Sequence, residues 1–443
     1  MRARAVSAVF LVVAALVAWL TVTEPLAARV LQAGVAASLV YVAWLAWRGS
    51  RVMRGALRAA RGGSAEPTGL ARELPFVTLL VPAWNEEAVI GQTLAHLASL
   101  AYADGEGRPR YDVLVVDDGS TDATGPVARA AASGAPHVRV VRREPPRGAP
   151  RTKGAVLAWA MDAVRGEVVG VVDADTRVGP SFLEDAMRAW RGDPSAAALQ
   201  VARRPHNAHR SWLTAAQAEE QLMDLASQCG RRAVDGTAEL RGNGMFVRVD
   251  ALQQVGGWDP TALTEDLELS TRLAIAGAHV ALAPHVGIGE EAVEGLAPLW
   301  HQRVRWAEGS LRRLIQHAPR MLAGSQPLSR KADFLAFAAE FLLPPLFATT
   351  TLASLVTVVL PQPADWTVPA SLALGYGAGV FLLALGGLSA IGVRGLALVG
   401  RAGRGSLFLS HWLLVVPWAL LRILAGPAEG HFRSTPRFTP MAP

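Results

Sequence analysis

The chain is poor in cysteine, lysine and charge. Its single cysteine, Cys229, excludes an internal disulfide and a zinc site built from several cysteines. Only two of its 43 basic residues are lysines, Lys153 and Lys331. Charged residues make up 18% of the 443, below the roughly 25% of an ordinary soluble protein. With 51% hydrophobic residues, the chain is expected to contain long apolar segments beside a normally charged domain.

These apolar segments lie at the two ends of the chain. Residues 5–22 and 26–47 form the first two, and residues 334–360, 368–391 and 407–424 form three more. A helix needs about 20 apolar residues to cross a hydrocarbon core, so each of them is a candidate membrane span. The first run also suits a cleaved signal peptide. The last also suits an interfacial or re-entrant segment.

Arginines after the second run indicate which side of the membrane the middle of the chain faces. Basic residues next to a span favour the cytoplasm, and the segment carries Arg48, Arg51, Arg54, Arg58 and Arg61. Residues 394–404, with three arginines, are expected as a loop on the same side. A net charge of +6 suits nucleic acid or an anionic membrane, and the spans favour the lipid bilayer over nucleic acid. We therefore predict a multi-pass protein of the cell (inner) membrane with a cytoplasmic middle domain.

The domain organisation follows from these segments. We expect two transmembrane helices (1–50), a basic linker (51–74), a cytosolic domain (75–295), amphipathic interfacial helices (296–330), two or three transmembrane helices (331–430) and a tail (431–443).

The cytosolic domain alternates between strand-like and helix-like segments. Apolar, β-branched runs at 76–81, 113–116, 138–141 and 168–172 predict buried strands. Helix-like stretches lie between them, at 86–97, 123–132 and 153–164. This alternation is typical of an α/β domain with a mostly parallel, Rossmann-like sheet.

Polar residues follow three of these strands, where ligands bind in open α/β sheets. They are Asn85 and Glu86, then Asp117 and Asp118, then Asp173 and Asp175. Any one cluster could be a turn or a helix cap. Three acidic clusters at one sheet edge instead indicate a bound cation, because unpaired carboxylates repel. The Asp173-x-Asp175 spacing suits Mg²⁺ or Mn²⁺, with phosphates completing the shell.

Further candidates lie beyond these strands. Lys153 opens a helix and could contact a diphosphate, or be a solvated surface lysine. Residues 241–248 read as a glycine-rich turn running into a strand. Thr264 is expected to cap a helix whose first turn holds Glu265 and Asp266, where an acid can cap the helix or deprotonate an acceptor.

An amphipathic stretch follows this helix. Gln302 and Trp306 are four residues apart and share a helical face, with Arg305 beside them. Arginine can bind phosphate, and an indole can stack under a sugar or lie at the membrane interface. Ordinary amphipathic packing is the alternative.

Taken in order, these motifs resemble those of inverting family 2 glycosyltransferases with a GT-A fold. The motifs are "VPAWNEE", "DDGSTD", "TKGAVLAW", "DADT", "LRGNGMFVR", "TEDLEL" and "QRVRW". Within that family the series looks most like the β-monoglucosyldiacylglycerol synthases.

The resemblance implies a role for each matching residue. Nucleotide-sugar binding would involve Pro82, Asn85, Glu86, Asp117, Asp118, Lys153, Asp173, Gln302 and Arg305. Asp173 and Asp175 would hold the metal, Asp266 would be the general base, and Glu265 and Trp306 would contact the acceptor. The implied reaction moves a hexose, glucose, from a UDP-sugar to a membrane lipid such as diacylglycerol. The alternatives are a processive polysaccharide synthase and a non-catalytic scaffold on the same fold.

Overall fold

The computed structural model describes residues 2–61, 75–146, 149, 151–359 and 366–426. Within them the chain forms two compact units. The helical unit contains Met1–Arg54, Ala215–Gly236 and Leu299–Ala428, and the sheet unit contains Gly55–Thr214 and Thr237–Pro298. Residues 62–74 of the expected linker and the expected tail lie outside the described residues.

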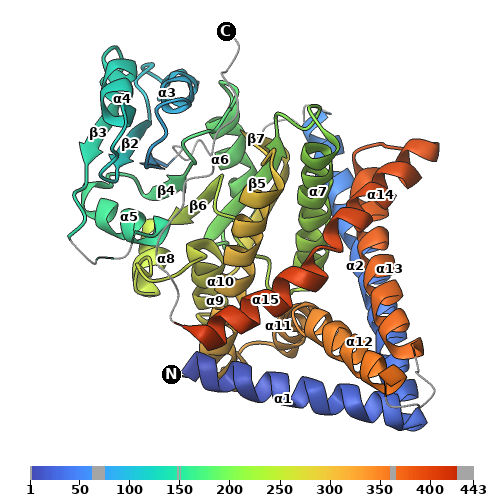
Figure 1. The fold of residues 1–443 in the computed structure, drawn as a ribbon. Coiled ribbons are helices and arrows are strands. Elements are labelled where there is room, and N and C mark those ends of the chain that lie inside the picture. The colour runs from blue at the N-terminus through green and yellow to red at the C-terminus, as the bar shows by residue number, and fades with distance from the viewer. Residues whose placement is uncertain (1, 62–74, 147–148, 150, 360–365, 427–443) are drawn as a thin grey trace. The chain divides into compact units, whose positions relative to one another are not determined.

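The described part of the sheet unit is built on one seven-stranded sheet with the order β3-β2-β1-β4-β6-β5-β7 (Figure 1). Its strands are β1 (Val77–Ala83), β2 (Tyr111–Asp117), β3 (Val138–Arg142), β4 (Val168–Val171), β5 (Ala198–Pro205), β6 (Met245–Arg248) and β7 (Val280–Glu290). The first four strands are mutually parallel, β6 is antiparallel to β4 and β5, and β7 is parallel to β5. The predicted α/β fold with a mostly parallel sheet is confirmed.

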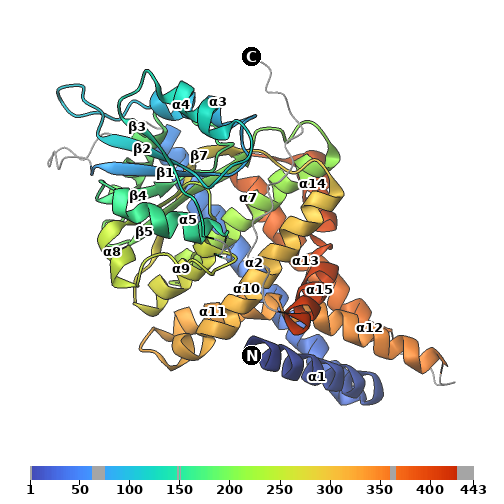
Figure 2. The same ribbon diagram turned by 60° about the vertical axis from the view of Figure 1, so that its left-hand side comes forward.

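Helices cover both faces of this sheet. Successive strand residues point to opposite faces, and the residues on both faces are apolar. Leu79 and Val81 of β1 belong to the core beneath α3 (Ile90–Ala98), α4 (Thr124–Ala132) and α6 (Phe182–Arg191). Leu80, between them, belongs to the opposite core with α5 (Lys153–Ala160), α8 (Val249–Gln254) and α9 (Glu265–Ile275). Figure 2 shows α3 and α4 on one side of the strands and α5, α8 and α9 on the other.

One predicted helix begins later than its sequence pattern indicates. We expected a helix at 86–97, and α3 starts at Ile90. Asn85 has a left-handed φ of 54°, which interrupts a helix. The backbone N–H groups of Glu86 and Glu87 donate to Thr124 and Asp122. Tertiary hydrogen bonds therefore hold this segment in a loop.

The helical unit is formed by helices from both ends of the chain. They are α1 (Arg2–Thr23), α2 (Pro25–Arg61), α7 (Trp212–Ala233), α10 (Leu296–Ala323), α11 (Leu328–Glu340), α12 (Leu343–Val359), α13 (Thr367–Ala390), α14 (Gly395–Leu409) and α15 (Trp412–Ala425). In the described part of the chain, five segments are long and apolar enough to cross a membrane: Ala3–Thr21, Pro25–Arg61, Leu328–Val356, Thr367–Ala390 and Gly395–Ala425.

Two segments expected as connections are helical. Residues 51–61, assigned to the basic linker, continue α2, as their arginine, alanine and leucine content allows. The expected loop at 394–404 is mostly part of α14. Its Arg401 and Arg404 donate to the fully buried carboxylate of Glu219 on α7, with Nε–O distances of 2.9 and 2.8 Å. This pairing compensates the buried carboxylate and links α14 to α7.

Two glycines allow α2 and α7 to approach closely. A Cβ on Gly49 would lie 2.0 Å from the carbonyl oxygen of Ala226, and one on Gly230 would lie 2.5 Å from that of Leu45. Real Cβ atoms cannot approach backbone so closely, so any larger residue at either position would separate the helices.

Candidate active site

The loops after β1 and β2 form one hydrogen-bonded wall of the site. Ala83 and Asp117 end these strands as register partners, so both loops leave the same edge of the sheet. The Asn85 N–H donates to Ser120 Oγ (3.0 Å), and Asn85 Oδ1 accepts from the Thr121 N–H (2.9 Å). The predicted nucleotide-binding loop Pro82–Glu86 is thereby fixed against the loop that contains Asp118.

The two aspartates at the end of β2 are buried and paired with arginines at the end of β3. Asp117 Oδ2 accepts from Arg142 Nη1 at 2.9 Å, and Asp118 Oδ1 accepts from Arg143 Nη1 at 2.5 Å. Asp117 also accepts the Ser120 N–H at 2.9 Å. The arginines compensate the charges of both acids, which reduces the cost of burying two adjacent carboxylates in one loop.

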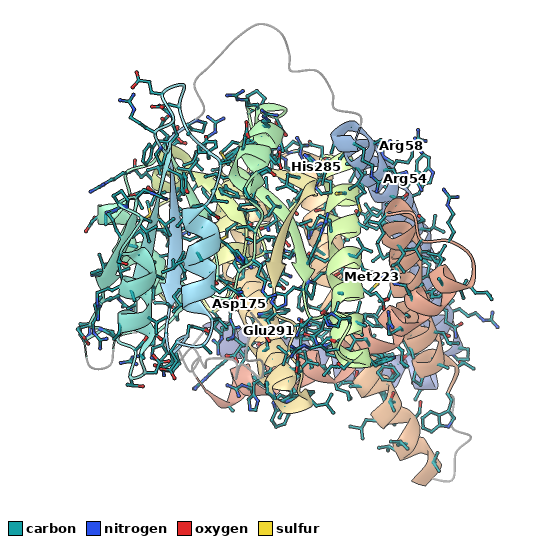
Figure 3. All side chains as sticks on the ribbon, turned by 90° about the horizontal axis from the view of Figure 1, so that it is seen from above. Arg54, Arg58, Asp175, Met223, His285 and Glu291 are labelled. Carbon is teal, nitrogen blue, oxygen red and sulfur yellow. The ribbon has the colours of Figure 1, made fainter. Side chains whose placement is uncertain are left out.

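The loop after β4 presents Asp173 and Asp175 at the same edge. Asp175 Oδ2 accepts from the Glu291 N–H at 3.2 Å, and Figure 3 shows these two residues side by side, away from His285. Asp173 Oδ1 accepts from Lys153 Nζ at 2.5 Å. The two carboxylates therefore face different partners, one a backbone amide and the other a cation.

Lys153 is buried between acids and is not a solvated surface lysine. Its Nζ lies 2.5 Å from Asp173 Oδ1, 3.7 Å from Glu265 Oε1 and 3.2 Å from the Gly242 carbonyl oxygen. Burial by itself would lower the pKa of the Lys153 ammonium, but Asp173 and Glu265 raise it above the ordinary lysine value. Lys153 is thus a permanent cation at neutral pH that links the loop after β4 to the start of α9.

Asp266 lies in the first turn of α9, and its carboxylate is partly exposed. Its Oδ1 accepts the Leu267 N–H at 2.8 Å. A Cβ built on Gly242, whose φ is 77°, would lie 3.3 Å from Asp266 Oδ2. Thr264 occupies the N-cap position as predicted, but its side chain makes no capping hydrogen bond. The turn at Gly242 thus lies beside Asp266 and beside Lys153, and Lys153 also contacts Asp173 and Glu265.

The acids offer a metal ion only oxygen ligands. Among the described residues, no group of three His, Cys, Asp or Glu side chains could hold a metal ion. The carboxylates of Asp173 and Asp175 are hard oxygen donors of the kind that Mg²⁺ and Mn²⁺ prefer. This donor set fits an ion whose remaining ligands come from bound phosphates.

The predicted residues Gln302, Arg305 and Trp306 lie on α10 in the helical unit. A neighbouring arginine that we did not single out, Arg303, is buried there. Its guanidinium lies 4.3 Å from the Trp306 ring centroid and is ion-paired with Glu220 of α7. The Arg303 guanidinium thus covers one face of the Trp306 indole.

Sequence reasoning missed Arg142 and Arg143, and it also missed Asn243. The two arginines directly follow the third apolar run, so inspecting every strand end, and not only the acidic ones, would have found them. Asn243 Oδ1 accepts from the Asp173 N–H at 3.1 Å. No local pattern signals that contact, because the two residues are 70 positions apart.

Residues 75–309 match the family described as "Glycosyltransferase like family 2". A β-monoglucosyldiacylglycerol synthase from Synechocystis sp. is 32% identical over 404 residues, which cover 88% of this chain and 82% of that protein. A poly-β-1,6-N-acetyl-D-glucosamine synthase from Staphylococcus aureus is 26% identical over 244 residues, covering 54% of this chain and 55% of that protein.

Among solved structures, a mannosyltransferase from Pyrobaculum calidifontis in complex with GDP-Man and Mn²⁺ is similar to this chain. The TM-score is 0.55 at 20% identity, over 87% of this chain and 99% of the other. At 20% identity, this similarity shows a shared fold.

Proposed function

Because the chain belongs to the family 2 glycosyltransferases, we propose that it transfers a hexose, glucose, from a UDP-sugar to a membrane lipid such as diacylglycerol. Membership confirms the predicted enzyme class, a hexosyltransferase of family 2 on a GT-A fold. The donor, the acceptor and the stereochemistry are the finer parts of the proposal.

One observation carries the choice of a lipid acceptor. The similarity to the β-monoglucosyldiacylglycerol synthase extends over 88% of the chain, which takes in flanking apolar helices as well as the sheet unit. The similarity to the poly-β-1,6-N-acetyl-D-glucosamine synthase covers only 54% of the chain. The apolar helices would be the part that meets a lipid or a polymer product, so the longer match favours the lipid over a processive polysaccharide synthase.

The donor would bind at the carboxyl edge of the parallel strands. The loops of Asn85 and Asp118 would hold the nucleoside, and Asp173 and Asp175 would face the diphosphate with Mg²⁺ or Mn²⁺. Such an ion, when bound, neutralises the charge that develops on the leaving diphosphate. Lys153 would hold the Asp173 carboxylate in place for this task.

In the proposed chemistry Asp266 acts as the general base. Its carboxylate takes the proton from the acceptor hydroxyl while that oxygen bonds to the anomeric carbon. The bond from this carbon to the diphosphate oxygen breaks, and UDP leaves with the electron pair. A single in-line displacement inverts the anomeric carbon and gives a β-glycolipid. Glu265 and, on α10, Gln302, Arg305 and Trp306 are proposed to bind the acceptor and the diphosphate.

We also propose a cytoplasmic catalytic domain, because the arginines that follow the second apolar run favour that side. Residues 75–295 would form this domain, and the five apolar segments would anchor the enzyme in the inner membrane as a multi-pass protein.

The proposal is tested with purified protein, radiolabelled UDP-sugars, Mn²⁺ and diacylglycerol in detergent. A discrete organic-soluble product that a β-glucosidase cleaves is expected with UDP-glucose. A high-molecular-weight aqueous product would instead establish a polysaccharide synthase.

A further inference from the structure

The turn Arg241–Gly244, which leads into β6, is hydrogen-bonded to the end of β4 and lies beside Asp173 and Asp266. Gly242 and Gly244 have φ values of 77° and 69°, and the Gly244 N–H donates to the Val171 carbonyl oxygen at 2.9 Å. The buried Gln200 of β5 accepts the Arg241 N–H at 2.7 Å and donates to the Asn243 carbonyl oxygen at 2.9 Å. Hydrogen bonds to β4 and β5 thus hold the turn in place.

Asn243 points from this turn to the loop after β4. Asn243 is 1% exposed, and its Oδ1 accepts from the Asp173 N–H and from Thr176 Oγ1, both at 3.1 Å. A backbone N–H can only donate, so the amide oxygen must face Asp173. Asn243 Nδ2 is then directed elsewhere, and it is buried without a hydrogen-bond partner among the described residues.

An unsatisfied buried donor costs about 1–3 kcal/mol. This cost offsets much of what the two hydrogen bonds to Asn243 Oδ1 contribute, and a buried group of this kind calls for another role. The same turn approaches the rest of the site: the Gly242 carbonyl oxygen accepts from Lys153 Nζ at 3.2 Å, and Gly242 lies against Asp266.

We infer that Asn243 is a positioning residue that fixes the backbone of Asp173 and thereby places the carboxylates of Asp173 and Asp175. This inference rests on the proposed function, in which those carboxylates face the nucleotide diphosphate. Asn243 touches no reacting atom and acts through Asp173. Without it the loop after β4 can shift, and small displacements of binding groups reduce affinity and rate strongly.

Asn243→Ala in the full chain tests this role. Calorimetry with UDP and Mn²⁺ should show an affinity at least about tenfold weaker than that of the wild type. The KM for the donor sugar should rise, while the KM for the lipid acceptor stays within about twofold, because the acceptor contacts are left intact. If Asn243→Ala does not fold, Asn243→Ser serves, since it also loses the bond to Asp173 but keeps a polar group.

Thr78→Val is the matched control. Thr78 is fully buried at the start of β1, where its hydroxyl donates to Asp112 Oδ1 (2.6 Å) and accepts the Gly166 N–H (2.9 Å). Thr78→Val loses these two hydrogen bonds and the one from the Arg165 N–H (3.1 Å), one more than Asn243→Ala loses, but at the opposite edge of the sheet. UDP affinity should therefore match that of the wild type.

Three results would count against the inference or its premise. Wild-type UDP affinity in Asn243→Ala would overturn the inference, and so would an equal loss of affinity in Thr78→Val. A wild-type protein without Mn²⁺-dependent UDP binding would instead remove the proposed function on which the inference rests.

Discussion

The ammonium of Lys153 lies 2.5 Å from the Asp173 carboxylate, so the first helical residue of α5 is bonded to the first acid of the DAD motif. The same ammonium lies 3.7 Å from Glu265, beside the proposed base. One buried cation therefore links the loop after β4 to the first turn of α9. This cation offsets part of the negative charge that the neighbouring acids bring together.

We expect Lys153→Met to lower activity and to move the acid limb of the pH–rate profile upward by about one pH unit or more. Without the cation, protonation of the neighbouring acids begins at a higher pH. In the wild type Lys153 is charged at every pH below the ordinary pKa of lysine. Because its pKa is raised, the ion pair is lost only at a still higher, strongly alkaline pH.

The chain's other lysine supplies the control for this variant. Lys331→Met removes a lysine from α11 in the helical unit, and its profile should coincide with that of the wild type. An unshifted acid limb in Lys153→Met would show that the ammonium does not control the ionisation of the site.

Asp266→Asn is expected to reduce turnover by at least about a hundredfold, because an amide cannot accept the acceptor's proton. UDP binding by calorimetry should remain close to that of the wild type. Asp250→Asn is the matched control: Asp250 lies in the first turn of α8, and its Oδ1 accepts the N–H of the next residue, as Asp266 Oδ1 does. Turnover near the wild-type rate in Asp266→Asn would refute the base assignment.

The parallel half of the sheet could be predicted from the sequence because three of its strands, β1, β2 and β4, are buried on both faces. Runs such as 113–116 are continuous and β-branched, and β2 extends that run only by a few residues. The strands β5 and β7 were not predicted. β5 ends in Arg203, Arg204 and Pro205, so its pattern resembles a loop, and its strand structure depends on pairing with β7.

The acids of the site could be predicted for a related reason. Parallel strands end at one edge, so Asp117 and Asp173 could be placed together without coordinates. The cations could not be placed in this way. The bonds of Lys153 to Asp173 and of Arg143 to Asp118 span 20 and 25 positions, and they depend on how helices and strands pack. Side-chain partners of this kind emerge only from tertiary structure.

Asp175→Asn should abolish the dependence of UDP affinity on Mn²⁺, because an amide is a much weaker ligand for a hard cation than a carboxylate. Calorimetry with Mn²⁺ and with EDTA measures this dependence directly. The wild type is expected to bind more tightly with the metal, and Asp175→Asn equally in both conditions. A metal effect of wild-type size in Asp175→Asn would exclude Asp175 from the metal site.

His285 on β7 should make the sheet unit less stable in acid. Burial lowers the pKa of its imidazole; Asp185 opposes this shift and Arg204 adds to it. The unfolded chain therefore binds a proton more readily than the folded one, so stability falls as the pH drops below about 6.5. In thermal melts between pH 7 and pH 5, His285→Gln should lose less stability than the wild type. His209→Gln, at an exposed histidine, should follow the wild type.

The buried pair Glu220–Arg303 should be strongly coupled, because each single substitution leaves the opposite charge unpaired. Breaking such a pair typically costs about 3–5 kcal/mol of the free energy of unfolding. Glu220→Gln and Arg303→Met should each be destabilising, whereas the double variant should lose less than the sum of the two. Chemical denaturation in detergent measures this cycle.

The exposed pair Glu184–Arg188 of α6 gives the comparison cycle. Solvent screens it, so its coupling should not exceed about 0.5 kcal/mol.

The Arg303 guanidinium also lies over the Trp306 ring, so Arg303→Met should raise the KM for the lipid acceptor if Trp306 binds that lipid. Additive effects of Glu220→Gln and Arg303→Met on stability would show that the ion pair does not hold α7 and α10 together. An unchanged acceptor KM in Arg303→Met would show that the position of Trp306 does not affect acceptor binding.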